Sequence, residues 1–127
     1  MYKEIIIIFV VVILVIGVDV ISNNYTKKAI EELSFELNNL KTGILEENLN
    51  KSLKQMEIVN KIWKEKYKVM AYYIEHDELE KVKTELTRLS ANIYVKEYKH
   101  CIEEIETSMF ILEHIGQKEK FDIISIF

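Results

Sequence analysis

Two short runs combine histidine with carboxylates: residues 75–78 read Glu-His-Asp-Glu, and residues 113–114 read Glu-His. Imidazole and carboxylate groups together can bind a metal ion or respond to pH near neutrality. A zinc-binding helix places two histidines four residues apart, whereas His76 and His114 are 38 positions apart. The favoured interpretation is therefore that these histidines lie near helix ends and pair with neighbouring acids. A pH- or metal-responsive site remains the alternative, and no metal ligand is assigned.

Cysteine and arginine each occur once in the sequence. Cys101 follows His100, but adjacent helical residues point about 100° apart, so they cannot act as a nucleophile and its base. Cys101 also falls on an apolar stripe, which predicts a small core residue. Arg88 is the single arginine beside sixteen lysines, and its planar group suits a carboxylate contact. We expect an interhelical ion pair at Arg88, with a binding role as the alternative.

An aromatic group surrounds the single tryptophan, comprising Trp63, Tyr67, Tyr72 and Tyr73. Such a group can line a ligand site, but a core whose tyrosine hydroxyls reach the rim is favoured. The sequence lacks a glycine-rich phosphate loop and any recognisable catalytic triad or carboxylate pair. We therefore predict no enzymatic activity and no cofactor.

Composition indicates helices: 127 residues, 49% hydrophobic and 30% charged, with no proline and three glycines. The formal net charge of −4 does not provide the excess of cations that nucleic-acid binding needs, so no nucleic-acid partner is expected. One cysteine excludes an intramolecular disulfide framework.

Residues 5–21 read IIIIFVVVILVIGVDVI, in which Asp19 is the only charge. This run predicts a single membrane-spanning helix, with Tyr2 and Tyr25 near the two interfaces. A cleaved signal peptide is the alternative, although no small-residue cleavage pattern follows. Lys3 and the short N-terminal tail favour an N-terminus inside the cell, whereas Lys27 and Lys28 favour the opposite orientation. We expect the first orientation, which places the rest of the chain outside the cytoplasm. Asp19 is interpreted as reaching interfacial water rather than forming a proton site.

Beyond residue 25, apolar residues recur at intervals of three and four, which is typical of amphipathic helices. The fold prediction is all-α: a transmembrane helix followed by an antiparallel bundle of about four helices, arranged as two hairpins. Asp77 is expected to cap the third bundle helix and Gly116 to end the fourth. The predicted divisions are a membrane anchor (1–24), a helical domain (25–116) and an apolar tail (117–127). In this topology His76 and His114 both lie at the membrane-proximal end.

The tail after Gly116 contains five large apolar residues, among them Phe121 and Phe127. A free tail of this kind seldom stays in water, so we expect it to lie on the bilayer or on a partner.

Several short motifs resemble a known bacterial family. They are Trp63, the run Ile74-Glu75-His76-Asp77-Glu78-Leu79, Leu86-Thr87-Arg88-Leu89, and Leu112-Glu113-His114-Ile115. Together with the N-terminal span they resemble the uncharacterised domain of unknown function 4363. The resemblance implies a small single-span membrane protein of low-GC Gram-positive bacteria and supplies no activity. The tail after Gly116 is longer and more apolar than the family pattern.

These observations favour a membrane-anchored interaction or structural module that acts as an accessory partner of another membrane protein. The expected partners are the lipid bilayer and either a membrane protein or further copies of the chain. The alternative function is a sensor that uses His76 and His114. The residues expected to serve interaction or sensing are Trp63, His76, Arg88, His114, Phe121 and Phe127.

Overall fold

The computed structural model describes the backbone of residues 1–126 and the side chains of residues 1–120. Four α-helices make up this part of the chain: α1 (Tyr2–Leu45), α2 (Leu49–Met70), α3 (His76–Tyr94) and α4 (Tyr98–Ile126). Residues 1–126 contain no strand. The all-α prediction is confirmed, with the apolar segment forming the first part of α1.

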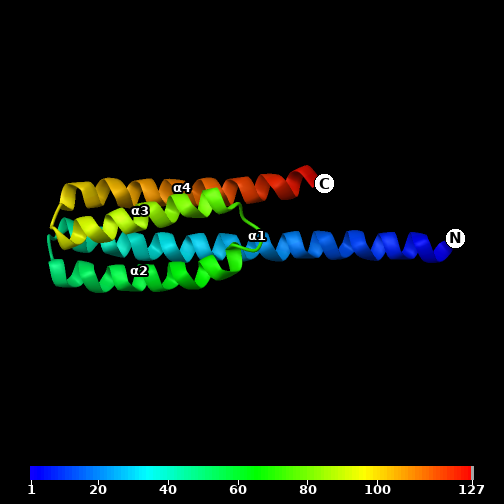
Figure 1. The fold of residues 1–127 in the computed structure, drawn as a ribbon, viewed down its shortest axis with the longest axis horizontal. Coiled ribbons are helices and arrows are strands. Elements are labelled where there is room, and N and C mark those ends of the chain that lie inside the picture. Colours follow the sequence, from blue (N-terminus) through cyan, green and yellow to red (C-terminus); the bar gives the residue numbers. More distant parts are fainter. Residues whose placement is uncertain (127) are drawn as a thin grey trace.

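Helix α1 is one continuous helix of 44 residues that serves two regions of the molecule. Residues 22–24, which join the apolar run to the bundle, are Ser-Asn-Asn and include neither glycine nor proline. Nothing in this short stretch breaks the helix, so α1 passes without interruption from the apolar run into the bundle. Figure 1 shows its N-terminal part projecting beyond the other three helices.

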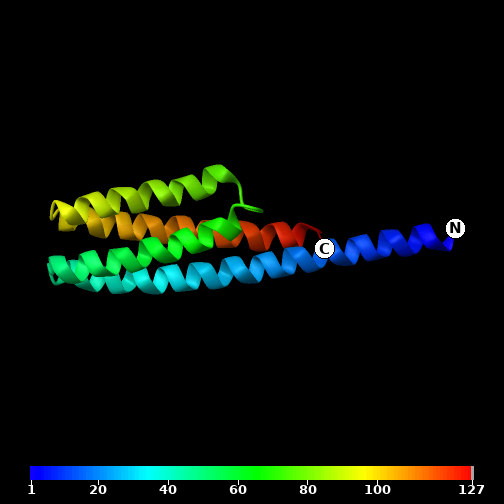
Figure 2. The ribbon, with the colours of Figure 1, turned by 60° about the horizontal axis from the view of Figure 1, so that its bottom comes forward.

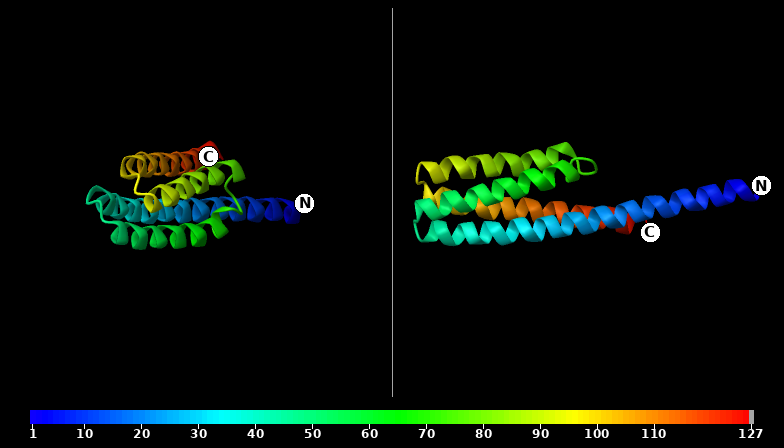
Figure 3. Two further views of the ribbon diagram at one scale, coloured as in Figure 1. Left: turned by 60° about the vertical axis from the view of Figure 1, so that its left-hand side comes forward. Right: turned by 90° about the horizontal axis from the view of Figure 1, so that it is seen from below.

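The bundle is antiparallel, with each helix reversing the direction of the one before it (Figures 1 and 2). Helix α1 packs against both α2 and α4, and α3 packs against α4. The two hairpins meet closely where α1 packs on α4 and make fewer contacts where α2 faces α3, so the α2–α3 seam is the looser one. The views in Figure 3 show the α1–α2 and α3–α4 turns at one end and the α2–α3 connector at the other.

The core is built from the predicted apolar stripes. The expected α3 stripe is buried throughout and consists of Leu79, Val82, Leu86, Leu89 and Ile93. The expected α1 stripe, Ile30, Leu33, Leu37, Leu40 and Ile44, is buried except at Ile30, which is half buried, and Ala29 lies in the core beside it. Their three- and four-residue spacing places each set on one helix face, so burial follows directly from the sequence pattern.

Two predicted helix boundaries are wrong. Helix α3 begins at His76 with Glu75 at the cap position and no side-chain cap bond, so Asp77 lies inside the first turn instead. There its negative charge faces the positive end of the helix dipole without capping it. Gly116 does not end α4, which continues to Ile126. Gly116 has no positive φ, and a Cβ placed there would lie 2.9 Å from Ile30 Cδ1, so this glycine permits a close approach to α1.

The α1–α2 and α3–α4 turns, at the end of the bundle away from the apolar run, have the same backbone conformation. Glu47 (φ 53°) and Lys96 (φ 62°) both adopt the left-handed conformation just after a helix. The following amides bond back into the helix, Asn48 to Gly43 O at 3.1 Å and Glu97 to Asn92 O at 2.9 Å. These are Schellman-type helix ends that lack the usual glycine.

Candidate functional site

The first feature that a functional interpretation must explain is the apolar surface of α1. None of the 18 residues in the most apolar stretch of this helix is buried inside the protein. The helix is long and apolar enough to cross a membrane. Large side chains from Ile5 to Val15 are all about half exposed or more. A helix that is apolar on every face needs a nonpolar surrounding, and the described chain provides none here.

The two histidine runs lie at the same end of the bundle, as expected. Glu75 Oε2 lies 3.4 Å from Lys118 Nζ, which places the start of α3 beside the last part of α4. His76 is 71% exposed, and its Nε2 lies 3.4 Å from Glu80 Oε1 on the same helix. The prediction that His76 pairs with a neighbouring acid is confirmed.

His114 is also exposed. Within the described part of the chain, no three or more His, Cys, Asp or Glu residues form a group that could hold a metal ion. Two surface histidines at one end of the bundle do not create a binding site by themselves, and the sensor function stays a prediction.

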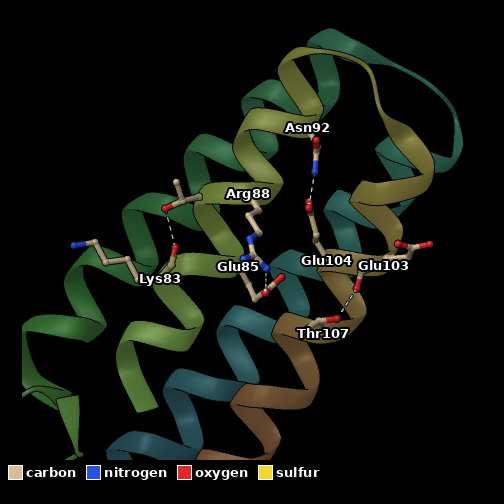
Figure 4. Close-up of polar contacts among 8 residues, drawn as sticks. Lys83, Glu85, Arg88, Asn92, Glu103, Glu104 and Thr107 are labelled. Atoms are coloured by element: carbon tan, nitrogen blue, oxygen red, sulfur yellow. Dashed lines mark hydrogen bonds and ion pairs between the residues drawn. The ribbon is translucent and has the colours of Figure 1, made fainter. Parts of the chain in front are cut away.

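The predicted interhelical ion pair at Arg88 is wrong. Arg88 Nη1 lies 3.1 Å from Glu85 Oε1, one turn earlier on the same helix (Figure 4). A spacing of three residues puts both side chains on one helix face, so the arginine finds its acid locally. The side chain that crosses from α3 to α4 is Asn92, whose Nδ2 donates to Glu104 Oε1.

Burial raises the pKa of the Glu104 carboxyl at this seam, although the Asn92 hydrogen bond opposes the shift. The negative charge of Glu85 raises this pKa further, and the positive charge of Arg88 lowers it. The hydrogen bond between Asn92 and Glu104 is therefore a polar link between α3 and α4. Glu104 was not singled out by sequence, because it lies in a helix rich in glutamates and has no distinctive spacing.

The four aromatic residues around Trp63 do not form one cluster in the structure. Trp63 is only 7% exposed, and its ring lies 5.8 Å from that of Tyr67. Tyr73 Oη and Thr26 Oγ1 share a 2.8 Å hydrogen bond, and burial raises the pKa of this tyrosine. Tyr72 departs from the prediction, because it is 91% exposed and contributes nothing to the core.

A groove of about 360 Å³ lies along the looser α2–α3 seam. Its lining combines aromatic, basic and small polar side chains, namely Asn60, Trp63, Lys64, Tyr67, Lys83, Leu86 and Thr87. The groove therefore brings aromatic side chains together with lysines from both helices.

Cys101 is a core residue, as predicted. Its side chain is fully buried, and burial raises the pKa of its thiol to about 11. His100 Nδ1 instead lies 3.5 Å from Glu103 Oε2 on the same helix. A buried, protonated thiol is a poor nucleophile, so this residue contributes packing.

Thr26, Ser52 and Ser108 are buried polar residues that the sequence interpretation missed. All three lie on apolar helix faces, so a small hydroxyl residue in register with a hydrophobic stripe was the available signal. The predicted interaction residues Phe121 and Phe127 cannot be placed in the same way. The side chain of Phe121 and the whole of Phe127 lie outside the described residues.

Comparison with known proteins gives one family match. A family model described as Domain of unknown function (DUF4363) matches residues 20–126. The comparisons with curated proteins and with solved structures give no match. The matched range starts where the apolar run ends and covers the whole bundle. The chain therefore belongs to the DUF4363 family.

Proposed function

We propose that this protein is a membrane-anchored helical module that docks on another membrane protein. The observation that supports the anchor is α1 itself, a single helix whose first part is exposed and apolar and whose second part belongs to the bundle core. A rigid helix shared by both parts would hold the bundle directly at the bilayer surface.

The dimensions of α1 agree with this role. The seventeen residues from Ile5 to Ile21 span about 25 Å at about 1.5 Å per residue. A typical hydrocarbon core is about 30 Å thick, and tyrosines at the flanks suit its interfaces. Because Lys3 lies on the short side of the span, we place the N-terminus in the cytoplasm and the bundle outside it.

The anchor is tested by expressing the full chain and washing the membranes with alkaline carbonate. We expect the protein to stay in the membrane pellet with an intact mass of 15.1 kDa. A shorter product that begins after the apolar run and leaves the pellet would show a cleaved signal peptide. Labelling of Tyr94→Cys in whole cells by a membrane-impermeant maleimide tests the orientation, since that position is exposed and far from the span.

The α2–α3 groove supports the docking part of the proposal. Tryptophan and tyrosine are enriched at protein interfaces, and here Trp63 and Tyr67 lie at an incompletely closed helix seam. Lys64 and Lys83 lie on the two sides of the groove, one from each helix. We expect an acidic or amphipathic segment of a membrane protein to bind there.

Docking is tested by chemical cross-linking in the native membrane, followed by purification in mild detergent and mass spectrometry. The expected result is one stoichiometric membrane partner that is lost in the double variant Lys64→Glu/Lys83→Glu. The matched control is Lys54→Glu/Lys99→Glu, which makes the same charge change at exposed positions outside the groove lining. Recovery of only the protein itself, or of its dimer, would overturn docking on a different protein.

A further inference from the structure

The connector between α2 and α3, residues 71–75, contains Tyr72, the most exposed large hydrophobic side chain among residues 22–120. Tyr72 is 91% exposed, whereas Met70 and Ile74 on either side are buried. The turn is held by a 2.8 Å bond from Ile74 N to Met70 O. The backbone is therefore fixed while Tyr72 extends away from the core.

The height of this connector along α1 is set by Tyr73. Its hydroxyl lies 2.8 Å from Thr26 Oγ1, five residues beyond the last apolar residue, Ile21. Five residues correspond to about 7.5 Å along the helix axis. A bilayer measures about 40–45 Å with its headgroups and about 30 Å without them, so each headgroup layer is about 5–7 Å thick.

The apolar run is also shorter than the hydrocarbon core by about 5 Å, so a centred span places the hydrocarbon boundary about 2 Å beyond Ile21. Thr26 then lies about 5 Å outside the hydrocarbon, within the headgroup layer. The Tyr73 hydroxyl, which bonds to Thr26, lies at this height, and Figure 3 shows the connector at the same end of the bundle.

The end of α4 reaches this height independently. Gly116 lies against Ile30, and α4 runs antiparallel to α1. Ten further residues carry α4 to Ile126, and ten residues back along α1 from Ile30 lead to Val20. The α4 backbone therefore passes the height of Thr26 and ends level with the last turn of the apolar run. Figures 1 and 2 show α4 extending further along α1 than α2 and α3 do. Residues 121–126 read FDIISI, which suits a bilayer surface more than water.

We propose that the α2–α3 connector lies within the lipid headgroup layer, with Tyr72 seated among the headgroups as a second contact beside the span. This inference rests on the proposed membrane anchor. Tyrosine rings favour this layer because their bodies are apolar and their hydroxyls reach water. Contacts by both the connector and the end of α4 would fix the height and tilt of the bundle over the membrane.

The test uses tryptophan fluorescence in full-length protein. Trp63 is the only native tryptophan, so Trp63→Phe provides a background in which Tyr72→Trp is the reporter. The matched control is Tyr94→Trp at the opposite end of the bundle, where the native side chain is 77% exposed. A third variant, Phe9→Trp, reports the span itself. Each is reconstituted into phosphatidylcholine vesicles with or without lipids brominated near the headgroup end of the acyl chains.

We expect bromine to quench the fluorescence of the Tyr72→Trp variant and to leave the Tyr94→Trp variant unchanged, because only the first ring lies at the membrane interface. Equal, weak quenching of both variants, with quenching of the Phe9→Trp variant in lipids brominated near the bilayer centre, would overturn the headgroup contact and leave the anchor standing. Absence of quenching in the Phe9→Trp variant would overturn the anchor proposal.

A second measurement covers the case in which Trp63→Phe disturbs the core. The single native thiol, Cys101, is fully buried, so it does not compete for a surface label. Tyr72→Cys and Tyr94→Cys can each carry a polarity-sensitive dye in the native Trp63 background. A blue shift on adding vesicles at position 72 alone is the expected result, and identical spectra at both positions would overturn the inference.

Discussion

Helix α1 carries apolar residues on every face over residues 5–21 and on one face over residues 26–44. The backbone is the same in both regions, and only the distribution of side chains changes. In the second region Leu33, Leu37 and Leu40 are fully buried, whereas in the first the large side chains from Ile5 to Val15 are all about half exposed or more. The comparison teaches that the period of the apolar pattern, rather than its total hydrophobicity, decides whether a helix belongs to a protein core.

The change between the two regions occurs within five residues of the helix. Ile21 is 69% exposed, and Thr26 is completely buried. Ser22, Asn23 and Asn24 separate these two positions and form the first polar surface of the helix. Variants made as pairs, one in each region of α1 or at each end of the bundle, can therefore test the difference directly.

The largest expected effect on the bundle comes from Leu37→Ala. Leu37 is fully buried, so the substitution leaves a cavity and lowers the free energy of unfolding by about 3 kcal/mol. Its partner is Leu14→Ala, the same change at an exposed position of the same helix, which should leave the value within about 0.5 kcal/mol. Urea unfolding in detergent, followed by the fluorescence of buried Trp63, measures the bundle alone. Equal losses in both variants would contradict the difference between the two regions.

A charge inserted into the span should act on the membrane and leave the bundle unchanged. Ile13→Lys places an ammonium group at the middle of the apolar run, which disfavours insertion by about 3 kcal/mol. We expect the protein to leave the membrane pellet in part during a carbonate wash. Phe35→Lys, at an exposed position of the bundle half, should be retained as well as the native chain. Full retention of Ile13→Lys would count against a lipid environment for residues 5–21.

The glycines of α1 extend the comparison to packing. A Cβ added at Gly43 would lie 3.1 Å from Ser52 Oγ and 3.6 Å from Ser52 N on α2, whereas nothing lies within 4 Å of a Cβ at Gly17. Gly43→Leu should therefore force α1 and α2 apart and lower the free energy of unfolding by about 1–3 kcal/mol. Gly17→Leu should leave urea unfolding of the bundle unchanged. A tolerated leucine at position 43 would show that the α1–α2 turn is loosely packed.

The junction of the two regions is tested by the adjacent tyrosines. Tyr73→Phe removes the hydroxyl that bonds to Thr26 and leaves the buried threonine hydroxyl without that partner. We expect a loss of about 1 kcal/mol in the free energy of unfolding. Tyr72→Phe removes the same group from an exposed ring and should have no measurable effect on unfolding. If the two variants unfold alike, the Thr26–Tyr73 bond does not stabilise the junction.

Much of this fold was predictable because its signals are local and periodic. The stripe from Leu79 to Ile93 and the run from Ile5 to Ile21 each depend on residues that are neighbours in sequence. The prediction that Gly116 ends a helix is wrong because glycine is favoured both at helix ends and where two helices pack closely, and the sequence does not distinguish these two roles. Only the contact with Ile30, which is distant along the chain, separates the two roles.

The polar contacts were predicted less well for a related reason. Arg88 has acids available both on its own helix and on α4, and spacing alone does not choose between them. The Thr26–Tyr73 bond joins residues 47 positions apart, so no local pattern contains it. The exposure of Tyr72 beside buried Ile74 likewise follows from the shape of one short connector.

The smallest expected effect, of opposite sign, lies at the end of the bundle away from the span. Lys96 adopts φ 62° after α3, a conformation that strains residues with a Cβ and that glycine adopts freely. Glycine relieves the strain of this conformation in the folded chain, but it also makes the unfolded chain more flexible, which offsets part of the gain. The net effect of Lys96→Gly should be to raise the free energy of unfolding by about 0.5 kcal/mol. The matched variant is Lys83→Gly, the same substitution inside α3, where glycine should lower the value by about 1 kcal/mol. Paired urea titrations followed through Trp63 measure both values. Opposite signs would show that backbone conformation, rather than loss of the lysine charge, controls the stability of this turn, and a loss in both variants would contradict that explanation.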